Sequence, residues 1–133
     1  MMNEPRIWVV DDDEDDQYFM RDACHKLIPP IEVKSLYDGD ELLSCLKEAK
    51  TLPQLVLLDL NMPRVNGFEA LSQVRAIPAY REIPIIVLST SVDSIDEEKA
   101  IRLRATDILS KPNNLDQLFA LIQQLVIKWE VTC

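Results

Sequence analysis

Three carboxylates stand at the ends of two apolar runs in this sequence. Asp11 and Asp12 follow the run Arg6–Val10, and Asp59 closes the run Leu55–Asp59. Carboxylates that lie close together repel one another unless a cation neutralises their charge. Mg²⁺, or Mn²⁺ in its place, takes oxygen ligands of this kind. If the fold brings the three acids together, they predict a divalent metal site.

A hydroxyl group and an ammonium group follow two further apolar runs. Ser89 comes after 85–88, and Lys111 comes after 106–110. Lysine is a compact point charge that suits phosphate oxygens, and serine donates a hydrogen bond to them. Together with the acids, these groups predict a site for phosphoryl oxygens. Asp59 would be its nucleophile, because a carboxylate can attack phosphorus and form an acyl phosphate.

The elements that must position these side chains alternate along the chain. The apolar runs read as strands buried on both faces, which is typical of a parallel sheet covered by helices. Amphipathic stretches at helical spacing lie between them. The predicted strands are 6–10, 31–36, 55–59, 85–88 and 106–110, and the predicted helices carry the apolar faces 19–27, 42–49, 68–74 and 115–129, with a fourth helix of thin apolar stripe beginning at Ser94.

This alternation predicts an α/β fold, a doubly wound flavodoxin-like (βα)5 sheet with strand order 2-1-3-4-5. Segment 31–36 alternates apolar and polar residues, as expected near a sheet edge. In such sheets ligands bind outside the carboxyl ends of the strands, so the acids and Lys111 should converge. Two helix starts are also predicted, with Ser94 and Glu97 as a capping box and Asn114 as the cap of the last helix, paired with Gln117.

Composition limits the remaining possibilities. A length of 133 residues predicts one domain, 1–133, with its core at about 6–130. The net charge of −9 argues against DNA binding through phosphate neutralisation. No run is long enough for a membrane span or a signal peptide, so we expect a cytoplasmic protein without membrane attachment. Cys24, Cys45 and Cys133 lack metal-ligand spacing and are expected to be reduced thiols, and His25 is expected on the surface.

The ordered set of motifs resembles the receiver domain of two-component response regulators, the CheY-like family. That family has an acidic pair after strand 1, an acceptor Asp after strand 3 followed by Met-Pro and Gly, Ser or Thr after strand 4, and Lys-Pro after strand 5. In this chain they correspond in order to Asp11-Asp12, Asp59 with Met62-Pro63 and Gly67, Ser89, and Lys111-Pro112. The resemblance covers nearly the whole length.

The resemblance implies a role for each of these residues. Asp59 would be phosphorylated, and Asp12, Asp59 and the backbone carbonyl of Asn61 would bind Mg²⁺. Asp11 would complete the acidic pocket through water. Ser89 and Lys111 would act on the phosphoryl group, and the Lys111-Pro112 bond is expected to be cis. Asn61 and Ser91, two residues beyond Asp59 and Ser89, would influence the lifetime of the acyl phosphate.

Two positions depart from the family pattern. Ile108 stands where the family usually has an aromatic switch residue, three positions before the lysine. Arg104-Ala105 stands where Gly-Ala commonly precedes strand 5. Both departures concern signal output more than phosphorylation.

By this resemblance the chain is a single-domain response regulator, not an enzyme beyond its own phosphorylation and dephosphorylation. A sensor histidine kinase or phosphotransfer protein would donate the phosphoryl group, and an unknown downstream protein would receive the signal. Apolar surface on the fourth and fifth helices would serve either packing or a partner or homodimer contact.

Three alternative functions fit the sequence pattern less well. A metal-dependent phosphatase with an aspartyl nucleophile would need Asp-x-Asp-x-Thr, and here Asp11 and Asp13 are followed by Asp15 where threonine should stand. A calcium loop starting at Asp11 would need glycine where Asp16 stands. A degenerate receiver acting as a scaffold would not need the complete acceptor set.

Overall fold

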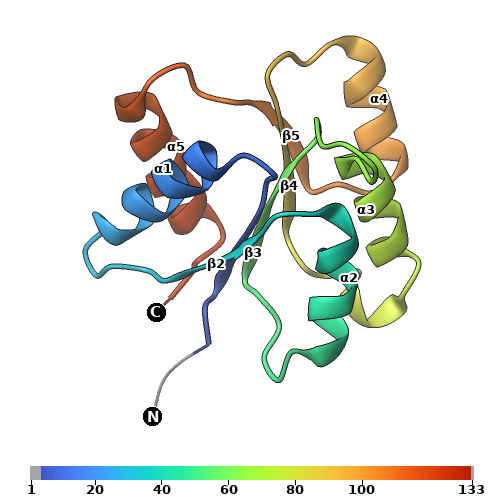
Figure 1. The fold of residues 1–133 in the computed structure, drawn as a ribbon, viewed down its shortest axis with the longest axis horizontal. Coiled ribbons are helices and arrows are strands. Elements are labelled where there is room, and N and C mark those ends of the chain that lie inside the picture. The colour runs from blue at the N-terminus through green and yellow to red at the C-terminus, as the bar shows by residue number, and fades with distance from the viewer. Residues whose placement is uncertain (1–3, 133) are drawn as a thin grey trace.

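Five parallel strands form one sheet in the order β2-β1-β3-β4-β5, as the sequence predicted (Figure 1). The computed structural model describes residues 4–132. The elements in chain order are β1 Ile7–Val10, α1 Glu14–His25, β2 Val33–Leu36, α2 Gly39–Glu48, β3 Leu55–Asp59, α3 Gly67–Arg75, a 3₁₀ turn η1 Pro78–Tyr80, β4 Ile85–Ser89, α4 Ser94–Arg102, β5 Asp107–Ser110 and α5 Leu115–Lys128. All five helices predicted from apolar spacing are present, and the two outer strands begin one or two residues later than predicted.

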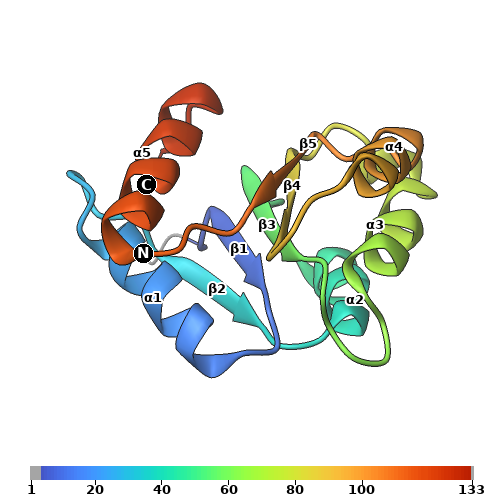
Figure 2. The same cartoon turned by 90° about the horizontal axis from the view of Figure 1, so that it is seen from above.

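Helices cover both faces of the sheet. Helices α1 and α5 lie on one face, and α2, α3 and α4 lie on the other (Figure 2). Alternate residues of the central strands feed the two cores: Trp8 and Val10 face α2 and α3, whereas Ile7 and Val9 face α1 and α5. Burial on both faces is why the central strands read as continuous apolar runs.

Each of the five helices begins with a side-chain cap at its amino terminus. Asp13 accepts hydrogen bonds from the backbone of Asp15 and Asp16 at the start of α1, and Asn114 accepts from the backbone of Gln117 at the start of α5. The capping box predicted at Ser94 is wrong, because Asp93 is the cap of α4. Ser94 is instead the first helical residue, and the side chain of Asp93 accepts a hydrogen bond from the backbone N–H of Asp96.

Arg75, at the end of α3, is a buried cation bound to backbone oxygens. Its guanidinium donates to the carbonyls of Arg104 at 2.9 Å, Tyr80 at 2.7 Å and Ile83 at 2.9 Å. Burial lowers the pKa of Arg75. Arg104 itself has a φ of 66°, in the left-handed region that favours glycine. The side chain of Arg75 therefore ties α3 to the turn after it and to the loop before β5.

The peptide bond before Pro112 is a further correction. Within residues 4–132 the single cis bond precedes Pro29, so the predicted cis Lys111-Pro112 bond is wrong. An X-Pro bond favours one isomer over the other by only about 0.5–1 kcal/mol in a free chain, so sequence does not decide it. Cys24 and Cys45 are free thiols, and Cys133 lies outside the described residues. None of the described helices combines the length and the apolar character that a membrane crossing requires.

Candidate functional site

The three predicted acids meet at the carboxyl ends of β1 and β3. One carboxylate oxygen from each of Asp11, Asp12 and Asp59 lies within 4.8 Å of the others. We call these three residues the acid cluster. Asp11 and Asp59 are buried, with 2% and 4% of their surface exposed, whereas Asp12 is exposed. They converge because β1 and β3 are neighbours and run parallel, with Val10 beside Leu58.

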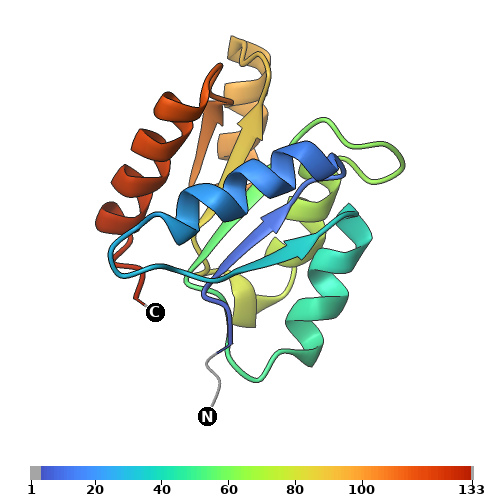
Figure 3. The same ribbon diagram turned by 60° about the vertical axis from the view of Figure 1, so that its left-hand side comes forward.

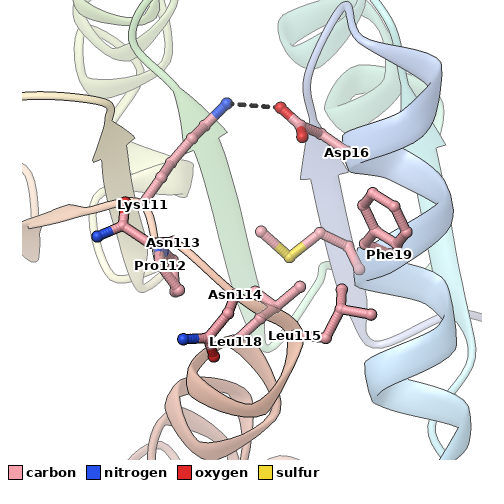
Figure 4. A pocket seen from close by; sticks show the side chains of 9 residues that line it. Asp16, Phe19, Lys111, Pro112, Asn113, Asn114, Leu115 and Leu118 are labelled. Carbon is pink, nitrogen blue, oxygen red and sulfur yellow. Dashed lines mark hydrogen bonds and ion pairs between the residues drawn. The ribbon is translucent and has the colours of Figure 1, made fainter.

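Lys111 reaches the acid cluster from the far side of the crevice. Its Nζ lies 3.0 Å from Asp11 Oδ2 and 3.2 Å from Asp59 Oδ1. It also lies 3.0 Å from Asp16 Oδ2, a contact visible in Figure 4. The backbone N–H of Lys111 donates to the carbonyl of Ser89 at 2.7 Å. The ammonium group is thus held among three carboxylates rather than free in solvent.

The loop between β3 and α3 is packed directly against the end of β3. The backbone N–H of Asn61 donates to Asp59 Oδ1 at 3.2 Å. A Cβ on Gly67 would lie 2.6 Å from the carbonyl oxygen of Asp59 and 2.8 Å from the Cα of Leu60, so only glycine fits there. Arg64, with a φ of 61°, donates to Asp38 at 2.7 Å and to Asp40 at 2.9 Å at the start of α2. The loop that carries Asn61 is therefore fixed at both ends.

Ser89 connects the end of β4 to this loop. Its hydroxyl lies 3.2 Å from Asn61 Oδ1 and 2.8 Å from the carbonyl oxygen of Ser91. A hydroxyl has one proton, so it donates to one of these oxygens at a time. Ser89 is buried, and both Asn61 and Ser91 are exposed. The predicted residues of strand 3 and strand 4 therefore form one connected group.

Ile108 does not join that group. It lies in β5 opposite Val87, and its half-buried side chain packs against the core under α2–α4. A pocket of about 300 Å³ between α4 and β5 is lined in part by Ala100, Ala105 and Ile108. The position predicted as a switch thus lies at the edge of the sheet, away from the acid cluster.

Burial and mutual repulsion control the charges of the site. Burial raises the pKa of Asp11 to about 6, and the charge of Asp59 adds to this rise, whereas the Asp13 backbone N–H and Lys111 oppose it. Burial lowers the pKa of Lys111, but its contacts with Asp11, Asp16 and Asp59 outweigh burial and leave that pKa above its ordinary range. The site therefore keeps its ammonium charged, and this single positive charge does not balance the carboxylates around it.

The donor set fits a divalent cation. The acid cluster offers only oxygen atoms, which are the ligands that Mg²⁺ and Mn²⁺ accept. Two of its carboxylates are buried, so their repulsion is weakly screened by solvent. Lys111 neutralises part of this charge from one side, and Asp12 leaves the opposite side open to solvent. A cation at the cluster would complete the neutralisation.

Sequence reasoning missed Asp16 and Gln17. The sequence assigned Asp16 no part in the site, but its carboxylate contacts Lys111. Gln17 is fully buried, and its amide donates to three backbone carbonyls around Asp11. A signal for Gln17 existed, because it stands three residues before Met20 and seven before Cys24, in the apolar stripe of α1.

A pocket of about 340 Å³ opens beside the site between α1 and α5. Figure 4 shows Asp16 and Lys111 at one end of it and the side chains of Phe19, Leu115 and Leu118 along it. Phe19 and Leu115 are 37% and 55% exposed, so the predicted inward face of both helices is wrong at these positions. Their apolar surface is instead available next to the charged crevice.

Residues 7–123 match the family model of the response regulator receiver domain. The chain belongs to this family. Receiver domains are the signalling domains of two-component systems. The match spans every element from β1 into α5, including the acid cluster and Lys111.

Similar proteins and solved structures agree with this assignment. The response regulator Rcp1 of Synechocystis sp. is 30% identical over 96% of this chain and 90% of its own length. The crystal structure of the phosphorylated cyanobacterial phytochrome response regulator RcpA is 30% identical, with a TM-score of 0.86 over 98% of this receiver domain and 97% of that chain. The Mn²⁺-bound form of Rcp1 is 28% identical with a TM-score of 0.82, covering 98% and 97% of the two chains.

Proposed function

We propose that this receiver domain accepts a phosphoryl group from a phosphohistidine on Asp59, in a reaction that depends on a divalent cation. The observation that carries the proposal is the acid cluster at the ends of β1 and β3 with Lys111 bound to two of its members. The phosphorylated state named for RcpA and the Mn²⁺ named for Rcp1 support the same chemistry here.

Asp59, Lys111 and Ser89 each have a separate role in the proposed phosphoryl transfer. An oxygen of Asp59 attacks phosphorus, the new P–O bond forms as the P–N bond breaks, and the electron pair of that bond returns to the imidazole, which is then protonated. Lys111 stabilises the charge on the phosphoryl oxygens, and Ser89 donates a hydrogen bond to them. Hydrolysis of the acyl phosphate by water restores the carboxylate.

The metal would be held by Asp12, Asp59 and the backbone carbonyl of Asn61, with Asp11 acting through water. When bound, Mg²⁺ or Mn²⁺ would neutralise the acids and the phosphoryl oxygens. The hydrogen bond from the Asn61 N–H to Asp59 supports this assignment, because it fixes the Leu60–Asn61 peptide, next to the peptide that carries the proposed carbonyl ligand. Asn61 and Ser91 remain our candidates for control of the acyl-phosphate lifetime, since both are exposed beside Ser89.

A sensor histidine kinase or a phosphotransfer protein is the proposed donor. Two similar structures are those of the phytochrome response regulator RcpA and of RPA3017, a response regulator in red light signalling of R. palustris, with 25% identity and a TM-score of 0.85 for the latter. A phytochrome-type kinase is therefore the first donor to test. Output would follow through partner binding or dimerisation at α4 and α5, where Ile95, Ile101 and Ile127 are largely exposed.

The test uses the purified chain, Mg²⁺ and a small phosphodonor such as acetyl phosphate. Intact-mass measurement should show the addition of one phosphoryl group to the wild type and to Asp107→Asn, a control that removes an exposed acid at the start of β5. Asp59→Asn and wild type with a metal chelator should gain none. Phosphorylation of Asp59→Asn would overturn the assignment of the acceptor.

The same experiment separates the alternatives. Continuous turnover of phosphomonoesters without a trapped phosphoprotein would indicate the aspartyl phosphatase. In the structure, however, the Asp13 carboxylate that such an enzyme would use caps α1 through the backbone of Asp15 and Asp16. No phosphorylation at all would favour a scaffold role and refute the proposal.

A further inference from the structure

The buried amide of Gln17 is a polar group that the proposed chemistry does not use. Its side chain is fully buried in the first turns of α1. Its Nε2 lies 3.0 Å from the carbonyl oxygen of Val9, 3.0 Å from that of Asp11 and 2.8 Å from that of Leu36. Two amide protons are thus shared among three carbonyls at the carboxyl ends of β1 and β2.

The other half of this amide is unsatisfied. Gln17 Oε1 is buried and has no hydrogen-bond partner among the residues 4–132. A buried acceptor without a partner costs stability, whereas an apolar side chain of the same shape would avoid that cost. Packing alone therefore does not account for a glutamine on the apolar stripe of α1, and its three donated bonds are the interactions that it adds.

These bonds hold the backbone of Asp11 from both sides. The N–H of Asp11 donates to the carbonyl of Leu36 at 2.9 Å, and the same carbonyl accepts from Gln17. The carbonyl of Asp11 belongs to the peptide that leads into Asp12, and it accepts from Gln17 as well. The carboxylate of Asp11 is fixed in turn by the backbone N–H of Asp13 at 2.9 Å.

We propose that Gln17 is a positioning residue for the acid cluster, which sets the peptide between Asp11 and Asp12 so that both carboxylates face Asp59. This inference rests on the proposed function, because it assigns Gln17 to the metal and phosphoryl site. Without the amide, the carbonyl of Asp11 would lose this donor, and the peptide that leads into the exposed Asp12 would lose one of its restraints. Residues that orient metal ligands in this way typically change metal affinity by about 10–100-fold when they are replaced.

The first test is the Mg²⁺ dissociation constant of Gln17→Met, measured by titration calorimetry without any phosphodonor. Methionine keeps the length and burial of the side chain and removes the amide. We expect the dissociation constant to rise about tenfold, the lower end of the range for such partners. Gln17→Asn, which keeps an amide but withdraws it by one methylene group, should show a similar rise and serves if the first variant folds poorly.

The matched control is Cys24→Ala, which removes a buried side chain two turns further along α1. It should lower the unfolding midpoint by opening a small cavity and leave the Mg²⁺ dissociation constant unchanged. An unchanged dissociation constant in Gln17→Met would overturn the inference, as would an equal loss of affinity in Cys24→Ala. A wild type that binds no Mg²⁺ would refute the proposed function itself, and with it this role.

A second measurement separates positioning from general stability. The same excess of Mg²⁺ should raise the unfolding midpoint of wild type and of Cys24→Ala by similar amounts, because ligand binding stabilises the fold by an amount that grows with the logarithm of the Mg²⁺ concentration over the dissociation constant. The rise should be smaller in Gln17→Met at the same Mg²⁺ concentration. A Gln17→Met variant with a lower midpoint and an unaltered response to Mg²⁺ would show that the amide has only a structural role.

Discussion

Two regions of the molecule differ in how they are fixed. The first is the site at the carboxyl ends of the strands, with the acid cluster, Ser89 and Lys111, and the second is the edge formed by α4 and β5. At the first region, side chains from separate strands bind one another, as Lys111 binds Asp11 and Asp59. At the α4–β5 edge the bonds go mainly to backbone groups, because β5 pairs with β4 and Arg75 donates to the carbonyl of Arg104. Ile95 and Ile101 of α4 are 71% and 76% exposed there.

The same two regions differ in how they follow the family pattern. The first carries the acids, Ser89 and Lys111 of a receiver domain in order. The α4–β5 edge carries Ile108 and Arg104 in place of the usual aromatic residue and glycine. The difference indicates that the first region keeps the residues that the proposed phosphorylation needs, whereas the second region, the proposed output surface, departs from the family pattern. Changes at the two regions should therefore separate chemistry from output.

The largest effect is expected from Lys111→Ala. The variant should still bind Mg²⁺, because removing the ammonium leaves the acid cluster more negative. Phosphorylation by acetyl phosphate should slow by about 100-fold or more, since a group that stabilises developing charge is lost. Initial rates from intact mass would measure this, with the exposed Lys47→Ala as control. A rate within threefold of wild type would remove Lys111 from the chemistry.

The next effect is a dependence of stability on pH in the absence of divalent ions. Asp11 has a folded pKa of about 6 against an ordinary value of 3.8, so the fold binds its proton more tightly than the unfolded chain does. The contribution of Asp11 to the free energy of unfolding is fully present below pH 3.8 and is lost as the pH rises through 6. The total loss is about 3 kcal/mol. Urea unfolding of wild type and Asp11→Asn should show this loss as a difference between them. Parallel pH curves for the two proteins would contradict it.

Gly67→Ala should act at the same region through backbone contact. The new methyl group would overlap the carbonyl oxygen of Asp59 and the Cα of Leu60, which forces the β3–α3 loop away from the acceptor. We expect a loss of about 1–3 kcal/mol in the free energy of unfolding, measured with urea, and weaker Mg²⁺ binding. Ser72→Ala, on the exposed face of the same helix, should stay within about 0.5 kcal/mol of wild type. Unchanged Mg²⁺ binding in Gly67→Ala would show that the loop tolerates displacement.

The smallest effect is expected at the other region. Arg104→Gly removes a side chain from a left-handed backbone position, a strain of about 1–2 kcal/mol, and adds the entropic cost of glycine, about 0.5–1 kcal/mol. The net change should be a stabilisation below about 1 kcal/mol by urea unfolding, with phosphorylation unaltered. A marked destabilisation would mean that the arginine side chain holds the α4–β5 edge in place.

The sequence alone predicted most of this architecture, for physical reasons that the structure makes plain. Buried parallel strands must be apolar on both faces, so β1, β3 and β4 stood out, and strand order placed Asp11, Asp12 and Asp59 together. Half-buried strands carry a weaker signal, and the starts of β2 and β5 were predicted one or two residues early.

What the sequence did not predict depends on side-chain direction. Asp16 was indistinguishable from its acidic neighbours until the turn of α1 directed it toward Lys111. The cap of α4 went to Asp93 rather than Ser94, because both residue types suit the position and a shift of one residue decides between them. The isomer at Pro112 and the left-handed backbone of Arg64 leave no pattern in the sequence, whereas the left-handed Arg104 stands where the family commonly has glycine.

Helix α3 has a consequence that reaches beyond the site. Its first residue, Gly67, lies against the backbone of Asp59, and its last, Arg75, donates a hydrogen bond to the carbonyl of Arg104 in the loop before β5. In Figure 3 this helix lies on the far side of the sheet from α1. Nine helical residues make a rod about 13 Å long. Because α3 is in contact with other segments at both ends, it transmits movement as one rigid body. A small displacement of the Asp59 backbone would therefore move the α4–β5 edge with it, without any aromatic side chain to relay the motion.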